Sequence, residues 1–242
     1  MLIVNADDLG ADSVATDRTL ACFQAGAITS ATAMMFMRDS ARGVALAREA
    51  GLPLGLHLNL TQPFDGDGVP PEIARRQASI VGFMANSTRR RLGVAPHLVS
   101  EIKRAVADQL EQFHQLYGGE PTHLDGHNHV HLNPTVLACL PTGYAVRPGH
   151  DSRRGLGQIP QRLRHAALAR RHRTVDHFFP LTTLHPALGG RGLEGALALA
   201  DTDSVELMVH PGAERIFTVL ENHDWAARIA ARPLGSYADV RP

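Results

Sequence analysis

Four histidines and one aspartate occupy every second position of the stretch His123-Leu124-Asp125-Gly126-His127-Asn128-His129-Val130-His131. Successive side chains of a strand point to opposite faces, so these five would share one face for as long as a strand lasts. Neutral imidazole is a common metal ligand and titrates near neutral pH. The pattern therefore favours a metal or proton-transfer site, and a histidine-rich, solvent-facing edge is the structural alternative.

A pair of adjacent carboxylates, Asp7 and Asp8, follows the apolar run of residues 2–6. Such a pair needs a cation, hydrogen bonds or open water, because the two charges repel each other. A helix N-cap would account for one aspartate, but Asp12 or Ser13 could fill that place. The pair favours a metal ligand beside a catalytic base.

Two more histidines lie at positions where a strand could deliver them. In residues 54–60 the leucines alternate with Gly55, His57 and Asn59, which would turn His57 inward in a parallel barrel. A satisfied core histidine is the alternative for His57. His210 follows an apolar run that begins at residue 205 and precedes Pro211-Gly212.

The elements that must position these residues alternate between strand and helix. Apolar runs predict strands at 2–6, 28–37, 54–60, 123–131, 143–147, 175–179 and 205–212. Helices are predicted at 13–25, 39–50, 97–117, 192–200 and 217–231. This order implies a parallel α/β sheet whose polar residues collect at the C-terminal strand ends, as in a closed or incomplete (β/α) barrel. The 242 residues are expected to form a single domain, 1–242.

Two segments depart from the alternation. Residues 62–96 begin with several prolines and glycines and contain Arg89-Arg90-Arg91. We expect this insertion to form a lid or a pocket wall, with the arginine triplet on a solvated face. Residues 153–173 carry seven arginines and are expected to form exposed helices, with an anion-binding patch as the alternative.

Composition narrows the function classes. The formal net charge is zero, which gives no global electrostatic case for nucleic acid or an anionic membrane. No apolar stretch approaches the roughly 18 residues of a membrane span. The run Leu2-Ile3-Val4 is too short for a signal-peptide core and has no basic region before it. Cys22 and Cys139 have neither metal-type nor disulfide-type spacing. We therefore expect a cytoplasmic protein with reduced, buried cysteines.

One aspartate and two histidines leave open positions on a metal for water and substrate. This ligand set serves hydrolytic zinc enzymes and iron oxygenases, and an Mg²⁺-type ion would keep more waters. A metal lowers the pKa of bound water, and a second carboxylate and a distant histidine can then act as base and acid. The extra aspartate and histidine have clear roles only in metal-assisted hydrolysis.

Four motifs resemble the YdjC-like carbohydrate deacetylases, a family that includes chitooligosaccharide and hopanoid-associated deacetylases. They are Asn5-Ala6-Asp7-Asp8-Leu9-Gly10, Gly55-Leu56-His57-Leu58, the stretch from Pro121 to His131, and Glu206-Leu207-Met208-Val209-His210-Pro211-Gly212. They recur in the family's order and cover most of the chain. The resemblance implies a distorted, incomplete (β/α) barrel that removes acetyl groups from N-acetylated sugars with a divalent metal, magnesium or zinc.

The resemblance also implies roles for single residues. The metal ligands would be Asp8, His57 and His127, with Asp7 as the base and His210 as the acid. Arg147, before Pro148, resembles the arginine that orients the base in related polysaccharide deacetylases. Substrate contacts are expected from Asn59, Asp125, His129 and His131. The segment before Arg147 is short and residues 62–96 match no family pattern closely, which leaves the substrate's identity open.

Three other functions remain in view. A metal-dependent sugar isomerase or oxygenase could use a similar barrel, and a carbohydrate-binding relative could have lost turnover. The intact Asp7–Asp8 pair argues against the latter, since binding needs no spare base. A nucleic-acid role is disfavoured by the zero net charge. The expected partner is an N-acetylated sugar, with no nucleic acid and no membrane span, and a homodimer is left open.

Overall fold

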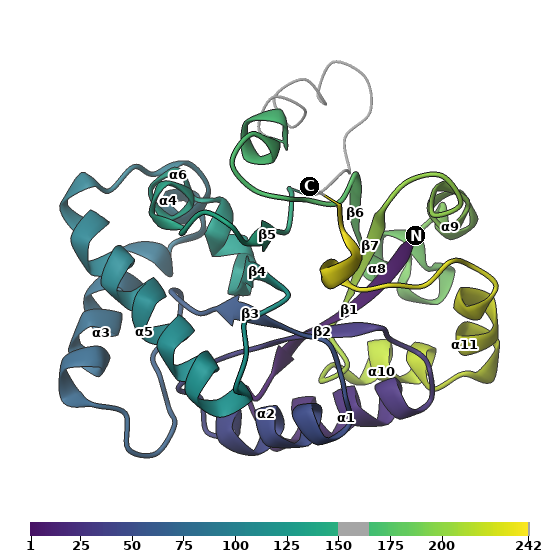
Figure 1. Ribbon diagram of the computed structural model, residues 1–242, viewed down its shortest axis with the longest axis horizontal. Coiled ribbons are helices and arrows are strands. Elements are labelled where there is room, and N and C mark those ends of the chain that lie inside the picture. The colour runs from purple at the N-terminus through teal and green to yellow at the C-terminus, as the bar shows by residue number, and fades with distance from the viewer. Residues whose placement is uncertain (150–164, 242) are drawn as a thin grey trace.

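The computed structural model describes residues 1–149 and 165–241. In this part of the chain, one sheet contains seven parallel strands in the order β5-β4-β3-β2-β1-β7-β6. The strands are β1 (Leu2–Leu9), β2 (Ser30–Ala33), β3 (Leu54–Leu58), β4 (His123–Gly126), β5 (Ala145–Val146), β6 (His177–Pro180) and β7 (Val205–Val209). Because β5 and β6 are the two edges, the curled sheet is a half-barrel (Figure 1). The predicted incomplete (β/α) barrel is confirmed.

Helices cover the outer face of this sheet (Figure 1). Short 3-10 turns lie between several of them. Before β4 the chain forms α1 (Ser13–Gln24), α2 (Ser40–Glu49), α3 (Pro71–Met84), α4 (Ser87–Leu92), η1 (Pro96–Leu98) and α5 (Val99–Tyr117). After β4 come η2 (His127–Leu132), α6 (Pro134–Cys139), α8 (Leu181–Leu184), η4 (Pro186–Leu188), α9 (Leu193–Leu199), α10 (Glu214–Leu220), α11 (His223–Ala230) and η5 (Tyr237–Asp239).

Alternation along β1 separates the core from the polar interior of the half-barrel. Leu2, Val4 and Ala6 are fully buried in the main hydrophobic core, under the helices. Asn5 and Asp7 lie on the opposite face, where Asn5 Nδ2 donates a hydrogen bond to Asp7 Oδ1. The same period of two that predicts a strand thus delivers polar groups to the barrel interior.

Several predicted boundaries differ from the structure. β1 extends beyond residue 6 to include Asp7 and Asp8, and β2 covers only Ser30–Ala33 of the predicted 28–37. The predicted helix 217–231 is two helices, because the Asn222 side chain accepts a hydrogen bond from the Asp224 amide and caps a new helix, α11. The helices at 13–25, 39–50, 97–117 and 192–200 are confirmed within two residues.

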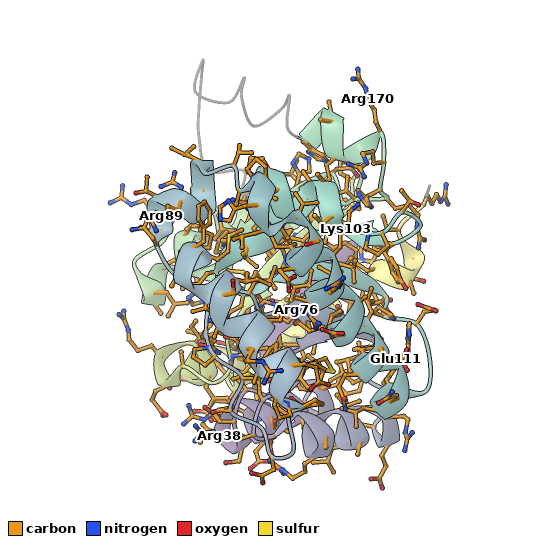
Figure 2. The ribbon with its side chains drawn as sticks, turned by 90° about the vertical axis from the view of Figure 1, so that its left-hand side faces the viewer. Arg38, Arg76, Arg89, Lys103, Glu111 and Arg170 are labelled. Atoms are coloured by element: carbon orange, nitrogen blue, oxygen red, sulfur yellow. The ribbon has the colours of Figure 1, made fainter. Side chains whose placement is uncertain are left out.

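The insertion of residues 62–96 contains two helices that were not predicted, α3 and α4. α3 begins at Pro71, a position where proline is favourable because the first helical amide needs no partner. Arg76 of α3, labelled in Figure 2, forms ion pairs with Asp108 and Glu101 of α5, which joins the insertion to the barrel. Arg89 of α4 is exposed at the edge of the molecule (Figure 2), whereas Arg90 is half-buried, so the predicted solvated face holds for only part of the arginine triplet.

Three further predictions concern the arginine-rich segment, the membrane and the two cysteines. Most of residues 153–173 lies outside the described residues, and 165–169 are helical. Within residues 1–149 and 165–241, no helix combines the length and the apolar character needed to cross a membrane. Cys22 and Cys139 are buried and free, as predicted.

Candidate metal and catalytic site

A backbone irregularity turns Asp7 and Asp8 toward the same site. Adjacent side chains of a regular strand would point to opposite faces. The register between β1 and β2 shifts between Ala6 and Leu9, and Asp8 has a left-handed φ of 69°. Such bulges re-aim side chains, and left-handed non-glycine residues are concentrated at functional sites.

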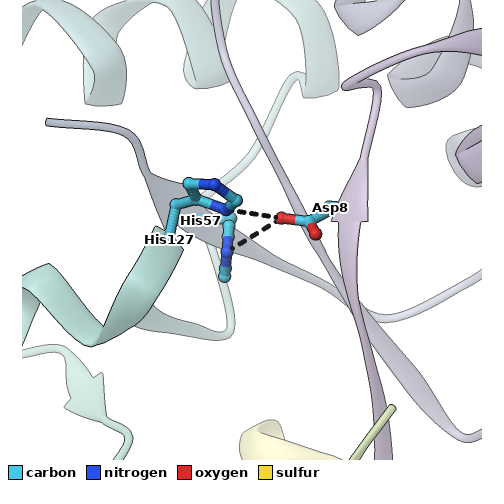
Figure 3. Close-up of side chains that lie close together, drawn as sticks. All are labelled: Asp8, His57 and His127. Carbon is cyan, nitrogen blue, oxygen red and sulfur yellow. Dashed lines mark hydrogen bonds and ion pairs between the residues drawn. The ribbon is translucent and has the colours of Figure 1, made fainter. Parts of the chain in front are cut away.

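Three side chains from three strand ends converge at this bulge (Figure 3). His57 comes from β3, His127 from the first residue after β4, and Asp8 from β1. Asp8 Oδ1 lies 2.9 Å from His127 Nδ1 and 3.2 Å from His57 Nε2. One ligand atom from each residue falls within 4.8 Å of the others, so the trio could hold a metal ion. The structure thus brings together the predicted ligands.

The surroundings of His57 fit a metal ligand. Its Nδ1 lies 2.7 Å from Asp125 Oδ1 and is buried with it. A metal-binding histidine commonly donates its other ring N–H to a carboxylate, which fixes the tautomer. His57 Nε2 is buried and makes no hydrogen bond, although it faces Asp8. Burying such an atom without a partner is costly, and a bound cation would satisfy it.

Asp7 belongs to a second, more deeply buried cluster that is centred on Arg147. The Arg147 guanidinium is fully buried and donates to both Asp7 oxygens, from Nη1 to Oδ2 at 2.7 Å and from Nη2 to Oδ1 at 2.6 Å. It also pairs with Asp125 at 2.7 Å and with Glu206 at 2.7 Å. Asp7, His57 and Asp125 also meet the spacing for a metal. Since Arg147 already neutralises two of those three, the Asp8 trio is the better cation site.

Opposing effects set the charge of the two aspartates. Burial alone would raise the pKa of Asp7, but the adjacent Arg147 guanidinium lowers it below its usual value. Burial would likewise raise the pKa of Asp8, but the adjacent imidazoles of His127 and His57 hold it well below its usual range. Both carboxylates are therefore ionised at neutral pH, as a base and a ligand must be.

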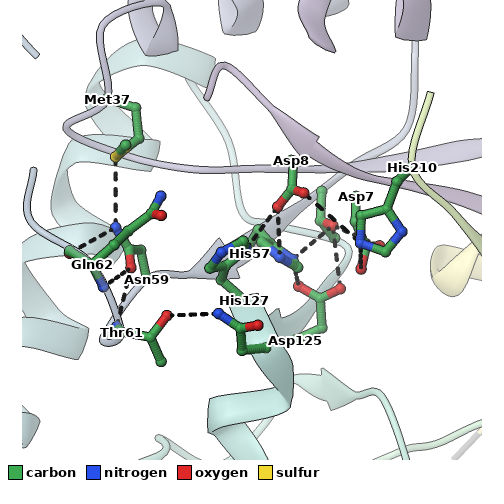
Figure 4. A network of polar contacts seen from close by, with 12 residues as sticks. Asp7, Asp8, Met37, His57, Asn59, Thr61, Gln62, Asp125, His127 and His210 are labelled. Carbon is green, nitrogen blue, oxygen red and sulfur yellow. Dashed lines mark hydrogen bonds and ion pairs between the residues drawn. The ribbon is translucent and has the colours of Figure 1, made fainter. Parts of the chain in front are cut away.

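His210 reaches the site from the end of β7. Its Nε2 lies 3.9 Å from Asp7 Oδ2 and 3.8 Å from Asp8 Oδ2, and its side chain is 36% exposed. Figure 4 shows His210 beside Asp7 and Asp8, on the side opposite His57 and His127. The predicted delivery of His210 to the same barrel mouth is confirmed.

A cavity of about 670 Å³ opens over these groups. Asp7, His57, His127 and His210 line its floor, together with His129. Its walls come from loops and helices around the barrel mouth and are formed by Arg90, Arg91, Leu92, Gly126, Asn128, Leu132, Pro134, Leu137, Gly149, His165, Ala167, Leu168 and Met208. The site is thus reachable by a substrate much larger than an acetyl group.

The histidine-rich stretch is not one continuous strand, so its five side chains do not share a face. β4 ends at Gly126, and residues 127–132 form a 3-10 turn in which Asn128 and His129 have left-handed φ values of 56° and 57°. His123 stacks on Tyr237 inside the barrel, whereas His127 reaches Asp8. The solvent-facing alternative is also wrong, because His123 and His131 are fully buried.

The four expected substrate contacts lie at different depths. His129 lines the cavity. Asp125, Asn59 and His131 are fully buried and bonded to protein groups. Asp125 holds His57 and Arg147, Asn59 accepts from the amides of Thr61 and Gln62, and His131 Nε2 lies 3.1 Å from the Arg147 carbonyl oxygen. None of these three lines the cavity, and Figure 4 shows Asn59 in a separate cluster.

Three residues of the buried network were not predicted as part of the site. Thr32 of β2 lies between Asp7, His57 and Asp125, 3.2 Å from the His57 Nδ1. Glu206 accepts from Arg147, and Tyr237 donates to Glu206. A lone charged residue in the apolar strand β7 is a sequence signal for Glu206. Tyr237 carries no comparable signal, because its partners are distant in sequence.

Comparisons with known proteins agree with this geometry. A family model described as YdjC-like protein matches residues 1–231. A human protein named carbohydrate deacetylase is 32% identical, covering 87% of this chain and 74% of the relative. A Serratia marcescens chitooligosaccharide deacetylase is 29% identical, with 87% and 81% covered. A Geobacillus stearothermophilus carbohydrate deacetylase is 32% identical, with 86% and 78% covered.

The fold also matches a solved structure. A protein from Enterococcus faecalis V583, described as a candidate for cellobiose-phosphate cleavage, superposes with a TM-score of 0.67 at 21% identity, covering 98% of this chain and 97% of the other. At that identity the match is evidence for the fold alone. The family model and the curated relatives together cover most of the chain, which therefore belongs to the YdjC-like protein family.

Proposed function

We propose that this protein is a metal-dependent hydrolase that removes the acetyl group from an N-acetylated sugar. The observation that carries the proposal is one cluster in which a three-residue ligand set, Asp8, His57 and His127, lies beside a separate carboxylate and a separate histidine. A binding site needs no such extra pair. The names of the human and Serratia relatives support a sugar substrate.

The ligand trio would hold a divalent cation, magnesium or zinc. When bound, such an ion polarises the amide carbonyl and lowers the pKa of water. Asp125 orients His57 through Nδ1 and leaves Nε2 facing the cation position. Asp8 and His127 are each more than a fifth exposed, which leaves an open side for water and substrate.

Asp7 and His210 would share the proton transfers. Asp7, held ionised by Arg147, accepts the proton of the attacking water at Oδ2. His210 donates a proton to the amine, which leaves poorly unless it is protonated as the bond breaks. His210 Nε2 lies 3.9 Å from Asp7 Oδ2, which is too far for a hydrogen bond, so the imidazole can turn toward the substrate.

The cavity walls would bind the sugar. Arg90, Arg91 and Leu92 line it from α4, so we propose the 62–96 insertion as a pocket wall. His129 would contact the substrate. Asn59, Asp125 and His131 are buried behind the wall, and we propose that they position neighbouring groups instead.

A panel of N-acetylated mono-, oligo- and lipid-linked sugars tests the proposal. We expect equal amounts of acetate and free amine, with metal present and not after chelation. An isomerase or oxygenase would change the sugar without acetate, and a binding protein would leave it unchanged. Either result would refute deacetylation.

A further inference from the structure

The C-terminal segment closes the interior of the half-barrel at the N-terminal ends of its strands. The Leu2 amide donates to the Pro233 carbonyl at 2.7 Å, and the Gly235 amide donates to the Leu2 carbonyl at 3.0 Å. Figure 1 shows this yellow segment returning into the opening of the curved sheet. Tyr237 is fully buried there, in a small core with Ile3, Ala145, Val175 and Val240. The segment thus bridges elements from both halves of the sheet.

Tyr237 makes two specific contacts in this position. Its ring stacks on His123 of β4, with centroids 3.8 Å apart and planes 11° apart. Its hydroxyl donates to Glu206 Oε2 of β7 at 2.5 Å. The other Glu206 oxygen accepts from Arg147 Nε at 2.9 Å. A continuous buried chain therefore runs from Tyr237 through Glu206 to Arg147, and from there to both oxygens of Asp7.

The orientation of Arg147 depends on carboxylates on more than one side. Asp7 and Asp125 bind its two terminal nitrogens, whereas Glu206 binds Nε and Nη2. Burial raises the pKa of Glu206 to about 7, and the hydrogen bonds from Arg147 and Tyr237 act against that rise. The tyrosine hydroxyl therefore helps to keep Glu206 charged and in place.

We propose that Tyr237 is a positioning residue that, through Glu206, holds Arg147 in the geometry that orients Asp7. This inference rests on the proposed function of Asp7 as the base. It concerns a residue beyond the matched range 1–231, so the family model does not include it. The C-terminal segment would then be part of the catalytic apparatus and not only a structural seal.

Tyr237→Phe tests the inference because it removes the hydroxyl and keeps the ring stacked on His123. We expect kcat on an N-acetyl sugar to fall about tenfold, the rate equivalent of one hydrogen bond, with KM and metal affinity unchanged. Ser236→Ala is the matched control, since it removes the cap of the same 3-10 turn without touching Glu206. It should keep the wild-type kcat.

A double-mutant cycle separates positioning from a general loss of packing. If Tyr237 acts through Arg147, adding Tyr237→Phe to Arg147→Lys should cost less than about twofold more. A Tyr237→Phe enzyme with wild-type kcat, or a full tenfold loss on top of Arg147→Lys, would overturn the inference.

A second measurement does not depend on turnover. The ¹⁵N–¹H signal of Arg147 Nε, assigned with Arg147→Lys, should shift in Tyr237→Phe and in Glu206→Gln and stay unchanged in Ser236→Ala. An unchanged signal in both variants would overturn the link even if no acetylated sugar proved to be a substrate. Wild-type protein that binds metal and releases no acetate would refute only the proposed function.

Discussion

At the scale of single residues, two adjacent aspartates differ because their partners differ. Asp7 is 2% exposed and gives both oxygens to Arg147, whereas the Asp8 side chain is 21% exposed and faces His57 and His127. The fixed guanidinium of Arg147 orients Asp7, whereas Asp8 is left open to a metal cation from solution. The bulge at Asp8 makes this division possible.

Asp7→Asn should retain metal and lose turnover. The amide cannot accept the proton of water, so kcat should fall by about 10² or more, the usual scale for a positioned base. Metal content by elemental analysis and kcat by acetate release check this together. Loss of metal in Asp7→Asn but not in Asp8→Asn would exchange the two roles.

His210→Ala should impair amide hydrolysis far more than hydrolysis of an activated ester, whose leaving group needs no proton. We expect a loss of about 10² or more on the N-acetyl substrate and less than about tenfold on the ester, with metal still bound. His131→Ala is the comparison, because His131 is buried away from the cavity. Equal losses on both substrates would remove His210 from the acid role.

At the scale of elements, helix α6 holds α4 against the cavity through one buried side chain. Asn133 caps α6 by accepting from the amides of Thr135 and Val136. Its Nδ2 donates to the carbonyls of Arg89, Arg90 and Gly93, at and just after α4. Two short helices that would be marginal alone are stabilised by each other.

Asn133→Ala should lower the free energy of unfolding by about 2 kcal/mol, because it removes a cap and the donor that joins α6 to the end of α4. Asn133→Ser keeps an N-cap acceptor and loses the amide donor without adding a charge, so it should cost less. Denaturant unfolding of the three proteins measures both changes. A serine variant less stable than the alanine variant, or no loss of stability in either, would contradict this role of Asn133.

Periodicity was sufficient to predict which segments are strands and where their polar ends meet. Leucine alternation in β3 correctly predicted that His57 turns inward, and the spacing of apolar runs predicted the parallel order. Alternation failed after Gly126, because left-handed residues Asn128 and His129 end β4 and redirect the chain. Asparagine and histidine adopt the left-handed conformation more readily than most residues, but the alternation of residue types does not show where they do so.

The buried second layer of the site was harder to predict, for a related reason. From the sequence, Gly55 is only a flexible residue in a strand. In the structure, a Cβ at this position would lie 2.5 Å from His123 Nδ1, which is too close for any side chain. The glycine is needed because His123 packs against β3 while stacking on Tyr237. Contacts between residues 55, 123 and 237 join three distant parts of the chain, and no local pattern encodes them.

At the scale of the whole molecule, buried neutral histidines couple stability to pH. Burial lowers the pKa of His131 to about 3. The unfolded residue has an ordinary pKa near 6.5, so below that pH unfolding takes up a proton that the folded residue does not bind. Its contribution to stability is fully present above about pH 6.5 and is lost as the pH falls toward 3.

His131→Gln should therefore flatten the pH dependence of folding. The glutamine amide can still donate to the Arg147 carbonyl but does not titrate. Between about pH 6 and 4, the free energy of unfolding of the wild type should fall more steeply, by about 1.4 kcal/mol per pH unit. Parallel curves for the two proteins would show that His131 is not held neutral.

The central claim is that deacetylation depends on a cation held by Asp8, His57 and His127. The most direct measurement titrates a divalent metal into chelator-treated protein and follows bound metal and acetate release together. We predict that the rate rises in proportion to occupancy and reaches its limit near one ion per chain, and that His57→Ala neither binds the ion nor releases acetate. Acetate release at the full rate by metal-free protein, or by His57→Ala, would contradict the claim.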